Sequence, residues 1–128
     1  MANANAVGWF EVPVTNMERA MKFYETVLNI QLNRQKMDAL DMAWFPWDET
    51  GTGSSGSLCC HPDYYKPSPD GVLIYFTCPS GDLANELSKV ESAGGKVLMP
   101  KTLINEEYGY YALILDTEGN RVSLHSRK

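Results

Sequence analysis

The stretch Gly8–Asn29, GWFEVPVTNMERAMKFYETVLN, predicts a strand, a tight turn and one helix, and this unit decides the fold. We expect an extended strand over Val7–Val14. Alternate residues of a strand point to opposite faces, so Trp9 and Glu11 share one face and the apolar Phe10 lies on the other. A strand that leads directly into a helix is half of a repeating unit, and a second such half appears later in the chain.

The helix after this strand has both a start signal and an apolar stripe. Thr15 and Asn16 offer side chains that suit a helix N-cap, and Glu18 would place a negative charge in the first turn, where the helix dipole favours it. Apolar residues then recur at helical spacing: Met17, Ala20, Met21, Tyr24 and Leu28. The pattern predicts an amphipathic helix packed against a sheet.

Length and charge narrow the class of protein. A chain of 128 residues fits one domain with its own core, and a net charge of −5 with a pI near 4.9 argues against nucleic acid or an anionic membrane surface as a partner. No apolar run reaches the ~20 residues of a membrane span. The segment MANANAVGW lacks the basic and apolar regions of a secretory signal, so we expect a cytoplasmic protein.

The three cysteines do not predict a disulfide framework. Cys59 and Cys60 are adjacent, Cys78 stands alone, and no CxxC spacing occurs. We expect small thiols buried or half-buried in strands.

The element order β-α-β-β-β occurs twice, which predicts an α+β fold of two modules in a single domain over 1–128. We place module one at about 7–62, a linker at 63–70 and module two at about 71–126. When the two halves are aligned with an offset of 64 residues, their apolar positions coincide, although their sequence identity is low. The predicted elements after the first helix are a mixed segment Ile30–Asp38, strands Met42–Trp47, Ser57–His61 and Val72–Cys78, a helix Asp82–Ala93, and strands Lys96–Met99, Tyr108–Asp116 and Arg121–His125, with loops at Asp48–Gly56 and Pro100–Glu107. Curved strands of the two halves would enclose a shared cavity.

Several segments together resemble the vicinal oxygen chelate superfamily, and more narrowly its glyoxalase-related branch. They are WFEVPVTNMERAMKFYETVL, AWFPWD with a glycine-rich loop and GSL, VLIYFTC, AGGKVLMPKT and YGYYALILDTEGNRVSLHS. The superfamily includes glyoxalase I, bleomycin- and fosfomycin-resistance proteins and extradiol dioxygenases. The resemblance covers nearly the whole chain and implies paired βαβββ modules, a concave pocket, frequent dimerisation and, in many members, a divalent metal.

The family's metal ligands have no counterpart at the aligned positions. The resemblance places the usual first-strand His or Gln at Trp9, the ligand from the last strand of module one near Ser57, the His that opens module two at Leu73, and the final Glu at Ser123. None of these side chains offers the carboxylate or imidazole that Zn²⁺, Ni²⁺, Mn²⁺ or Fe²⁺ needs. We therefore expect no cofactor, with a divalent metal possible only at a displaced site.

Two residues further along the same strands, the side chains are ionisable. Glu11 follows Trp9 on its face, and His125 follows Ser123, so a carboxylate and an imidazole would be available to move a proton. Glu11 with Cys59 and His61 could instead form a displaced metal site. The structural alternatives stay open: Glu11 satisfied by a backbone or tyrosine partner, His125 a surface residue near the C-terminus, and His61 an exposed residue before Pro62.

The predicted pocket faces are rich in aromatic residues, which stack on planar or apolar ligands, although each ring alone fits an ordinary core equally well. The candidate ligand-binding residues are Trp9, Trp44, Ser57, Cys59, Leu73, Tyr75, Thr77 and Ser123, and the candidate catalytic residues are Glu11 and His125.

Three functions remain compatible with the sequence. We favour a homodimeric protein that binds a small, partly aromatic molecule in its cavity. The second is a metal-independent lyase or isomerase that uses Glu11 and His125 as acid and base. The third is a metal-dependent glyoxalase or dioxygenase. The residues at the four aligned metal positions argue against it.

Overall fold

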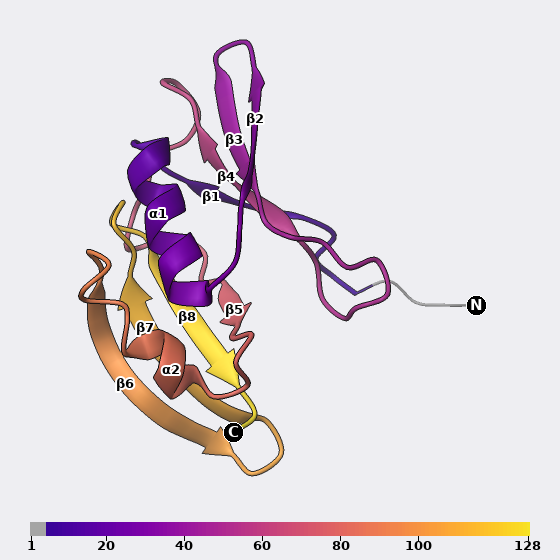
Figure 1. Ribbon diagram of the computed structural model, residues 1–128, viewed down its shortest axis with the longest axis vertical. Coiled ribbons are helices and arrows are strands. Elements are labelled where there is room, and N and C mark those ends of the chain that lie inside the picture. The colour runs from indigo at the N-terminus through magenta and orange to yellow at the C-terminus, as the bar shows by residue number, and fades with distance from the viewer. Residues whose placement is uncertain (1–4) are drawn as a thin grey trace.

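The computed structural model describes residues 5–128 and contains two helices and eight strands in the order β-α-β-β-β, twice. Figure 1 shows module one above module two, with both helices on the same side of the molecule. The elements are β1 Phe10–Pro13, α1 Met17–Leu28, β2 Asn33–Met37, β3 Leu40–Trp44, β4 Gly56–Cys60, β5 Tyr75–Thr77, α2 Leu83–Leu87, β6 Lys96–Asn105, β7 Gly109–Leu115 and β8 Arg121–Ser126.

The strands form two separate sheets of four, one in each module. Their orders are β1-β4-β3-β2 and β5-β8-β7-β6. In each sheet the first strand of the module pairs in parallel with the last, and the remaining pairs are antiparallel. The predicted α+β fold of two βαβββ modules is confirmed.

The decisive opening stretch folds as its pattern predicts. Asn16 is the N-cap of α1, and its side-chain oxygen accepts a hydrogen bond from the backbone N–H of Arg19 at 3.0 Å. Asn29 ends the helix in the left-handed conformation, with φ of 53°. One face of α1 is buried against the sheet, and its buried residues are Met17, Ala20, Phe23, Tyr24, Val27 and Leu28.

An aromatic cluster joins the two modules at the core. Phe10, Tyr24 and Phe45 come from module one and Phe76 from module two, with neighbouring ring centroids 5.4–5.8 Å apart. Offset and edge-to-face contacts at these distances are favourable for aromatic pairs. The cluster fixes the edge of β1 near the edge of β5.

The second helix is shorter than predicted. α2 covers Leu83–Leu87, and the rest of the predicted Asp82–Ala93 helix is a series of turns. The backbone N–H groups of Lys89 and Val90 bond to carbonyls three residues back, and the Ser88 hydroxyl donates to the Asn85 carbonyl at 2.7 Å. A serine side chain that bonds to the backbone of its own turn competes with regular α-helix. The backbone bonds of Lys89 and Val90 therefore span three residues instead of four.

The predicted Pro100–Glu107 loop is wrong, because strand β6 runs through Pro100 to Asn105. β6 lies at the edge of its sheet, where a proline without an N–H does not break a ladder on both sides. Register shifts between Val97 and Met99, and again between Met99 and Thr102, bend the strand around the proline.

The first strands of both modules are shorter than predicted. The predicted Val7–Val14 and Val72–Cys78 strands reduce to β1 and β5, and each pairs with only one neighbour. Single backbone hydrogen bonds still join the flanks to the neighbouring strands: the Val14 N–H donates to the Cys59 carbonyl, and the Cys78 N–H donates to the His125 carbonyl. β3 ends at Trp44, two residues before Pro46 rather than after it.

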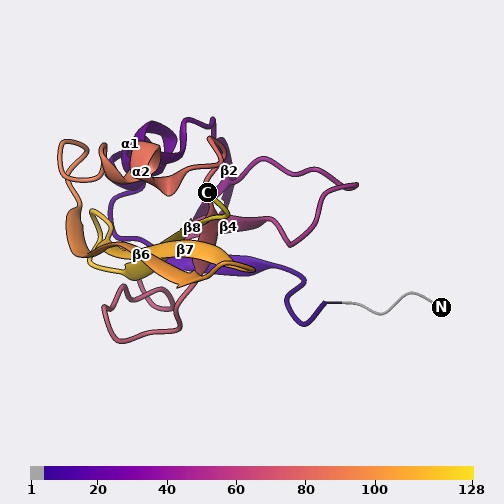
Figure 2. The same ribbon diagram turned by 90° about the horizontal axis from the view of Figure 1, so that it is seen from below.

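The linker between the modules passes on the side of the sheets away from the helices, as Figure 2 shows. It contacts both modules. The Tyr65 hydroxyl donates to Glu11 of β1, and the Ser68 backbone N–H donates to Asn120, just before β8. No helix within residues 5–128 is long and apolar enough to cross a membrane.

Candidate functional site

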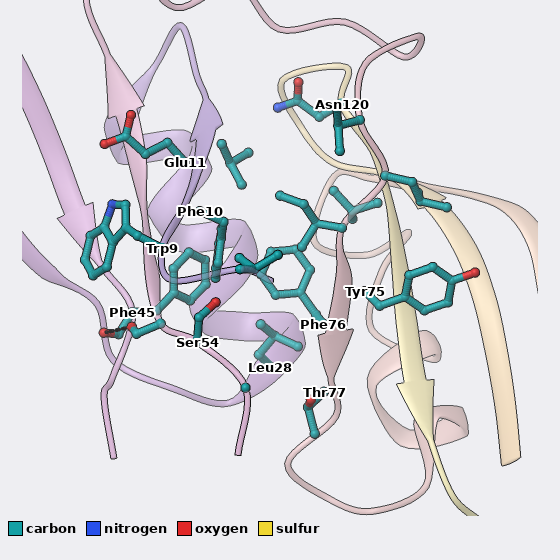
Figure 3. A pocket seen from close by; sticks show the side chains of 18 of the residues that line it. Trp9, Phe10, Glu11, Leu28, Phe45, Ser54, Tyr75, Phe76, Thr77 and Asn120 are labelled. Carbon is teal, nitrogen blue, oxygen red and sulfur yellow. Dashed lines mark hydrogen bonds between the residues drawn. The ribbon is translucent and has the colours of Figure 1, made fainter. Parts of the chain in front are cut away.

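A groove with a volume of about 1040 Å³ lies between the modules. We call it the inter-module groove. Its walls come from β1 and the segment after β3 on one side, and from the segment Gly71–Thr77, which includes β5, on the other. Figure 3 shows Phe10 and Phe76 close together between the modules, with Trp9 and Glu11 on the module-one side and Tyr75 on the module-two side.

Both modules contribute aromatic rings to the groove. Phe10 and Phe45 line it from module one, and Phe76 lines it from module two, as part of the shared aromatic core. Trp9 and Tyr75 are more open, with exposed fractions of 43% and 51%. A hollow with buried rings at its base and exposed rings at its rim suits a planar, partly apolar ligand.

The rim continues into a smaller hollow on module one. Trp9 and Trp44 stack edge to face, with ring centroids 5.9 Å apart. Trp44, Trp9 and Trp47 line this second hollow, and Trp9 and Trp47 also line the inter-module groove. Trp9 is therefore shared by the two hollows, whereas Trp44 reaches the groove only through its contact with Trp9.

Glu11 lies in the groove with a partner from the linker. The Tyr65 hydroxyl donates to Glu11 Oε1 at 2.6 Å. This hydrogen bond, together with partial burial, raises the pKa of Tyr65 well above its ordinary value, so the hydroxyl stays protonated at neutral pH. Glu11 lines the groove, and the neutral phenol of Tyr65, outside the described lining, holds its carboxylate from the linker.

Of the ten residues proposed from sequence, five line the groove: Trp9, Glu11, Leu73, Tyr75 and Thr77. Three others are buried in the sheets. Ser57 donates to the carbonyls of Ala43 and Leu58, and Ser123 donates to the carbonyl of Ala112 at 2.9 Å. Cys59 is fully buried, and burial raises the pKa of its thiol to about 11. These three do not reach the groove, because their short side chains are engaged within the sheet.

His125 is not part of the described groove lining, and it is not paired with Glu11. It is half-buried on β8, and its Nε2 lies 2.7 Å from the carbonyl oxygen of Tyr108. His61 stacks on Tyr64 with ring centroids 4.7 Å apart, and its Nδ1 accepts the backbone N–H of Asp63. Neither imidazole is hydrogen-bonded to the Glu11 carboxylate among residues 5–128.

The residues at the family's metal positions do not fit a divalent cation. Trp9 and Leu73 have no donor atom for a metal, and the hydroxyls of Ser57 and Ser123 donate to backbone carbonyls. The displaced set is no better, since Glu11 is bonded to Tyr65 and Cys59 is a buried, neutral thiol. Within residues 5–128, no three His, Cys, Asp or Glu side chains are grouped for a metal.

Sequence reasoning missed three features of the groove. The linker closes one side through Lys66 and Ser68, next to the Tyr65 bond. Asn120 of module two connects the modules, since its side-chain amide donates to the Pro13 carbonyl of module one at 2.7 Å. Arg121 lies beside it in the lining. Alternation along β8 puts Arg121 on the same face as Ser123, a candidate residue, and this spacing was the sequence signal for Arg121.

The chain matches a family model and a set of solved structures. The model of the Glyoxalase/Bleomycin resistance protein/Dioxygenase superfamily matches residues 6–124. A glyoxylase/bleomycin resistance protein/dioxygenase domain from Frankia sp. EAN1pec is similar with a TM-score of 0.73 and 15% identity, covering 98% of this chain and 100% of that one. No curated protein sequence matches the chain.

Two further structures belong to proteins whose names state a function. TnmS3, an antibiotic binding protein from Streptomyces sp. CB03234, is similar with a TM-score of 0.66 and 22% identity, covering 100% of this chain and 99% of that one. Glyoxalase I from Zea mays has a TM-score of 0.66 and 19% identity, covering 93% of this chain and 45% of that one. The chain thus spans less than half the length of the maize enzyme. At these identities the likeness shows the fold.

Proposed function

Since the chain belongs to the glyoxalase/bleomycin resistance protein/dioxygenase superfamily, we propose that it binds a small, partly aromatic molecule in the inter-module groove, without a metal ion. One observation carries the proposal: both modules present aromatic side chains to the same hollow, with Trp9 and Phe10 on one side and Tyr75 and Phe76 on the other. The similarity to TnmS3, which is named as an antibiotic binding protein, supports binding of a small molecule.

The volume and chemistry of the groove support this ligand class. About 1040 Å³ lies at the upper end of the range for small-molecule sites, so a ligand of two or three fused rings fits with room for polar groups. Tyr75 is half exposed without a ligand, and stacking would remove its ring from water.

The test uses phenylnaphthylamine, an uncharged aromatic probe that fluoresces in apolar surroundings. The variant is Tyr75→Ala, and the matched control is Tyr108→Ala, because both tyrosines are 51% exposed and only Tyr75 lines the groove. We expect Tyr75→Ala to weaken probe binding about 5- to 10-fold, the size of one aromatic stacking contact. Equal affinity of the two variants, or no binding by the wild type, would count against the proposal.

A metal-independent lyase or isomerase is the second candidate, and the Glu11–Tyr65 contact favours it. Glu11 offers a base at the wall of the groove, and a protonated phenol 2.6 Å from its carboxylate offers an acid. This arrangement replaces the Glu11–His125 pair predicted from sequence. Turnover of an aromatic carbonyl substrate that falls steeply in Glu11→Gln would support an enzyme, and turnover unchanged in Glu11→Gln would remove the acid–base role.

We also propose that the protein needs no metal ion for its function. Tryptophan, leucine and two serines at the aligned positions support it, because none is a good ligand for a divalent cation. Elemental analysis of protein purified without an affinity-tag metal is the test. Near-stoichiometric Zn, Ni, Mn or Fe would overturn it.

We further propose a homodimer located in the cytoplasm. Large apolar side chains are exposed near the groove, among them Val72 at 92% and Trp47 at 71%, and a second copy would cover such a surface. Three free cysteines are compatible with a reducing compartment. Sedimentation equilibrium tests the dimer, and fractionation of cells that express the protein tests the location.

A further inference from the structure

On the basis of the proposed function, we propose that Arg121 holds an oxyanion of the ligand, so that the preferred ligands are small aromatic acids such as carboxylates. Two observations meet at this residue. Arg121 lines the inter-module groove, and its side chain has a buried nitrogen without a hydrogen-bond partner.

Arg121 begins β8 and lies on the same face of the sheet as the open aromatic ring of Tyr75. β8 pairs in parallel with β5, and Ser123 lies opposite Tyr75. Arg121 is two residues before Ser123, so its side chain points to the same face, about 7 Å along the strand. A ring stacked on Tyr75 would then lie within reach of the guanidinium.

The guanidinium of Arg121 has no protein partner among residues 5–128. Its Nε is shielded from solvent and makes no hydrogen bond, and the residue takes part in no ion pair. The other three arginines are engaged: Arg19 with Glu118, Arg34 with Asp41, and Arg127 with the Glu107 carbonyl. A buried donor without a partner is costly, and an incoming acceptor relieves that cost.

The other charged side chains of the groove already have partners. Glu11 accepts from Tyr65, Asp48 accepts from Thr50, and Lys66 donates to the carbonyl of Pro62 at 2.9 Å. Among these four charged side chains of the described lining, only Arg121 has a shielded polar atom without a hydrogen-bond partner. A planar guanidinium binds a carboxylate through two parallel hydrogen bonds, which favours an acid over a neutral or cationic ligand.

The experiment compares two probes that share their rings and differ in one charge. Anilinonaphthalene sulfonate (ANS) carries an oxyanion, and phenylnaphthylamine has the same rings without it. Fluorescence titrations with both probes are made on the wild type, on Arg121→Gln and on Arg127→Gln, a matched control that loses the same charge outside the groove. We expect Arg121→Gln to weaken ANS binding about 10-fold or more, because a charge-assisted contact is lost, and to leave phenylnaphthylamine within about 2-fold.

A second measurement does not depend on a variant. Raising the salt from about 50 mM to about 500 mM should weaken binding of ANS to the wild type and leave the uncharged probe nearly unchanged. Arg121→Lys, which keeps the charge without the planar fork, should fall between the wild type and Arg121→Gln. Melting curves of the variants check that they fold.

The outcomes separate the two proposals. If the wild type binds neither probe, the proposed aromatic groove fails, and the role of Arg121 fails with it. If the wild type binds both probes equally, or if Arg121→Gln affects both probes alike, the groove survives and the oxyanion site is wrong. The same holds if Arg127→Gln weakens ANS as much as Arg121→Gln.

Discussion

The Arg19 guanidinium of α1 donates to the Glu118 carboxylate of module two, with 2.7 Å between Nε and Oε2. Glu118 Oε1 also accepts the backbone N–H groups of Thr15 and Asn16, at 2.8 and 2.9 Å. A carboxylate from the turn between β7 and β8 therefore caps the first helix of the other module. The favourable field at a helix N-terminus adds to these bonds.

This contact makes stability depend on pH. Burial alone would raise the pKa of Glu118, but the donors from Arg19, Asn16 and Thr15 outweigh it and lower the pKa to about 2. A carboxyl with a depressed folded pKa stabilises the fold above its unfolded value of about 4.5, and that stability is lost as the pH falls towards 2. We expect urea unfolding to show a loss of about 1–3 kcal/mol in this window, after allowance for solvent screening.

The Glu118→Gln variant isolates this contribution. It should lower the free energy of unfolding at neutral pH and flatten its fall in acid, because the titrating group is gone. Glu106→Gln, on the loop before β7, is the control and should behave as the wild type. Parallel acid titrations of the wild type and Glu118→Gln would refute the role of Glu118.

Gly56 is required by the close pairing of β1 and β4. A Cβ atom at this position would collide with the backbone oxygen and ring of Phe10, whereas a Cβ at Gly8 meets nothing within 4 Å. We expect Gly56→Ala to destabilise the protein by about 1–3 kcal/mol, measured by urea unfolding, and Gly8→Ala to have little effect. If the two variants unfold alike, the strands separate at little cost and the packing argument is wrong.

The sequence predicted the architecture because its strongest signals are local. The alternation around Phe10 and the cap at Asn16 lie within one short stretch, and the structure confirms both. The second half carried weaker signals. The predicted Pro100–Glu107 loop failed because β6 pairs along a sheet edge, which no local pattern reveals.

The site was predicted less completely, for a geometric reason. Alternation along single strands grouped Trp9 with Glu11, and Tyr75 with Thr77, and all four line the groove, but so do Phe10 and Phe76 from the opposite faces. It could not tell which positions on those faces are covered, so it also selected the buried Ser57. The partner of Glu11 comes from an irregular linker, where residue spacing carries no information about contacts.

The bond between Tyr65 and Glu11 predicts an effect on the linker. Tyr65→Phe removes the hydroxyl that donates to Glu11 at 2.6 Å and keeps the ring. We expect faster hydrogen exchange of the linker amides and a loss of about 1 kcal/mol or less in stability, since the bond is exposed. Tyr64→Phe is the control, because the Tyr64 side chain is 78% exposed. Unchanged exchange in Tyr65→Phe would show that the linker is held by other contacts.

The three cysteines should differ sharply in reactivity. Burial raises the pKa of the Cys59 thiol to about 11 and that of Cys78 to about 12, and both side chains are shielded, whereas Cys60 is only half-buried. Because the thiolate is the reactive form, native protein should react with Ellman's reagent at a single thiol, Cys60, at about pH 8. Cys60→Ser should abolish this reaction in the native state and leave two thiols reactive in denaturant. A native Cys60→Ser protein that still reacts would place Cys59 or Cys78 within reach of solvent, through opening of the sheet or the core.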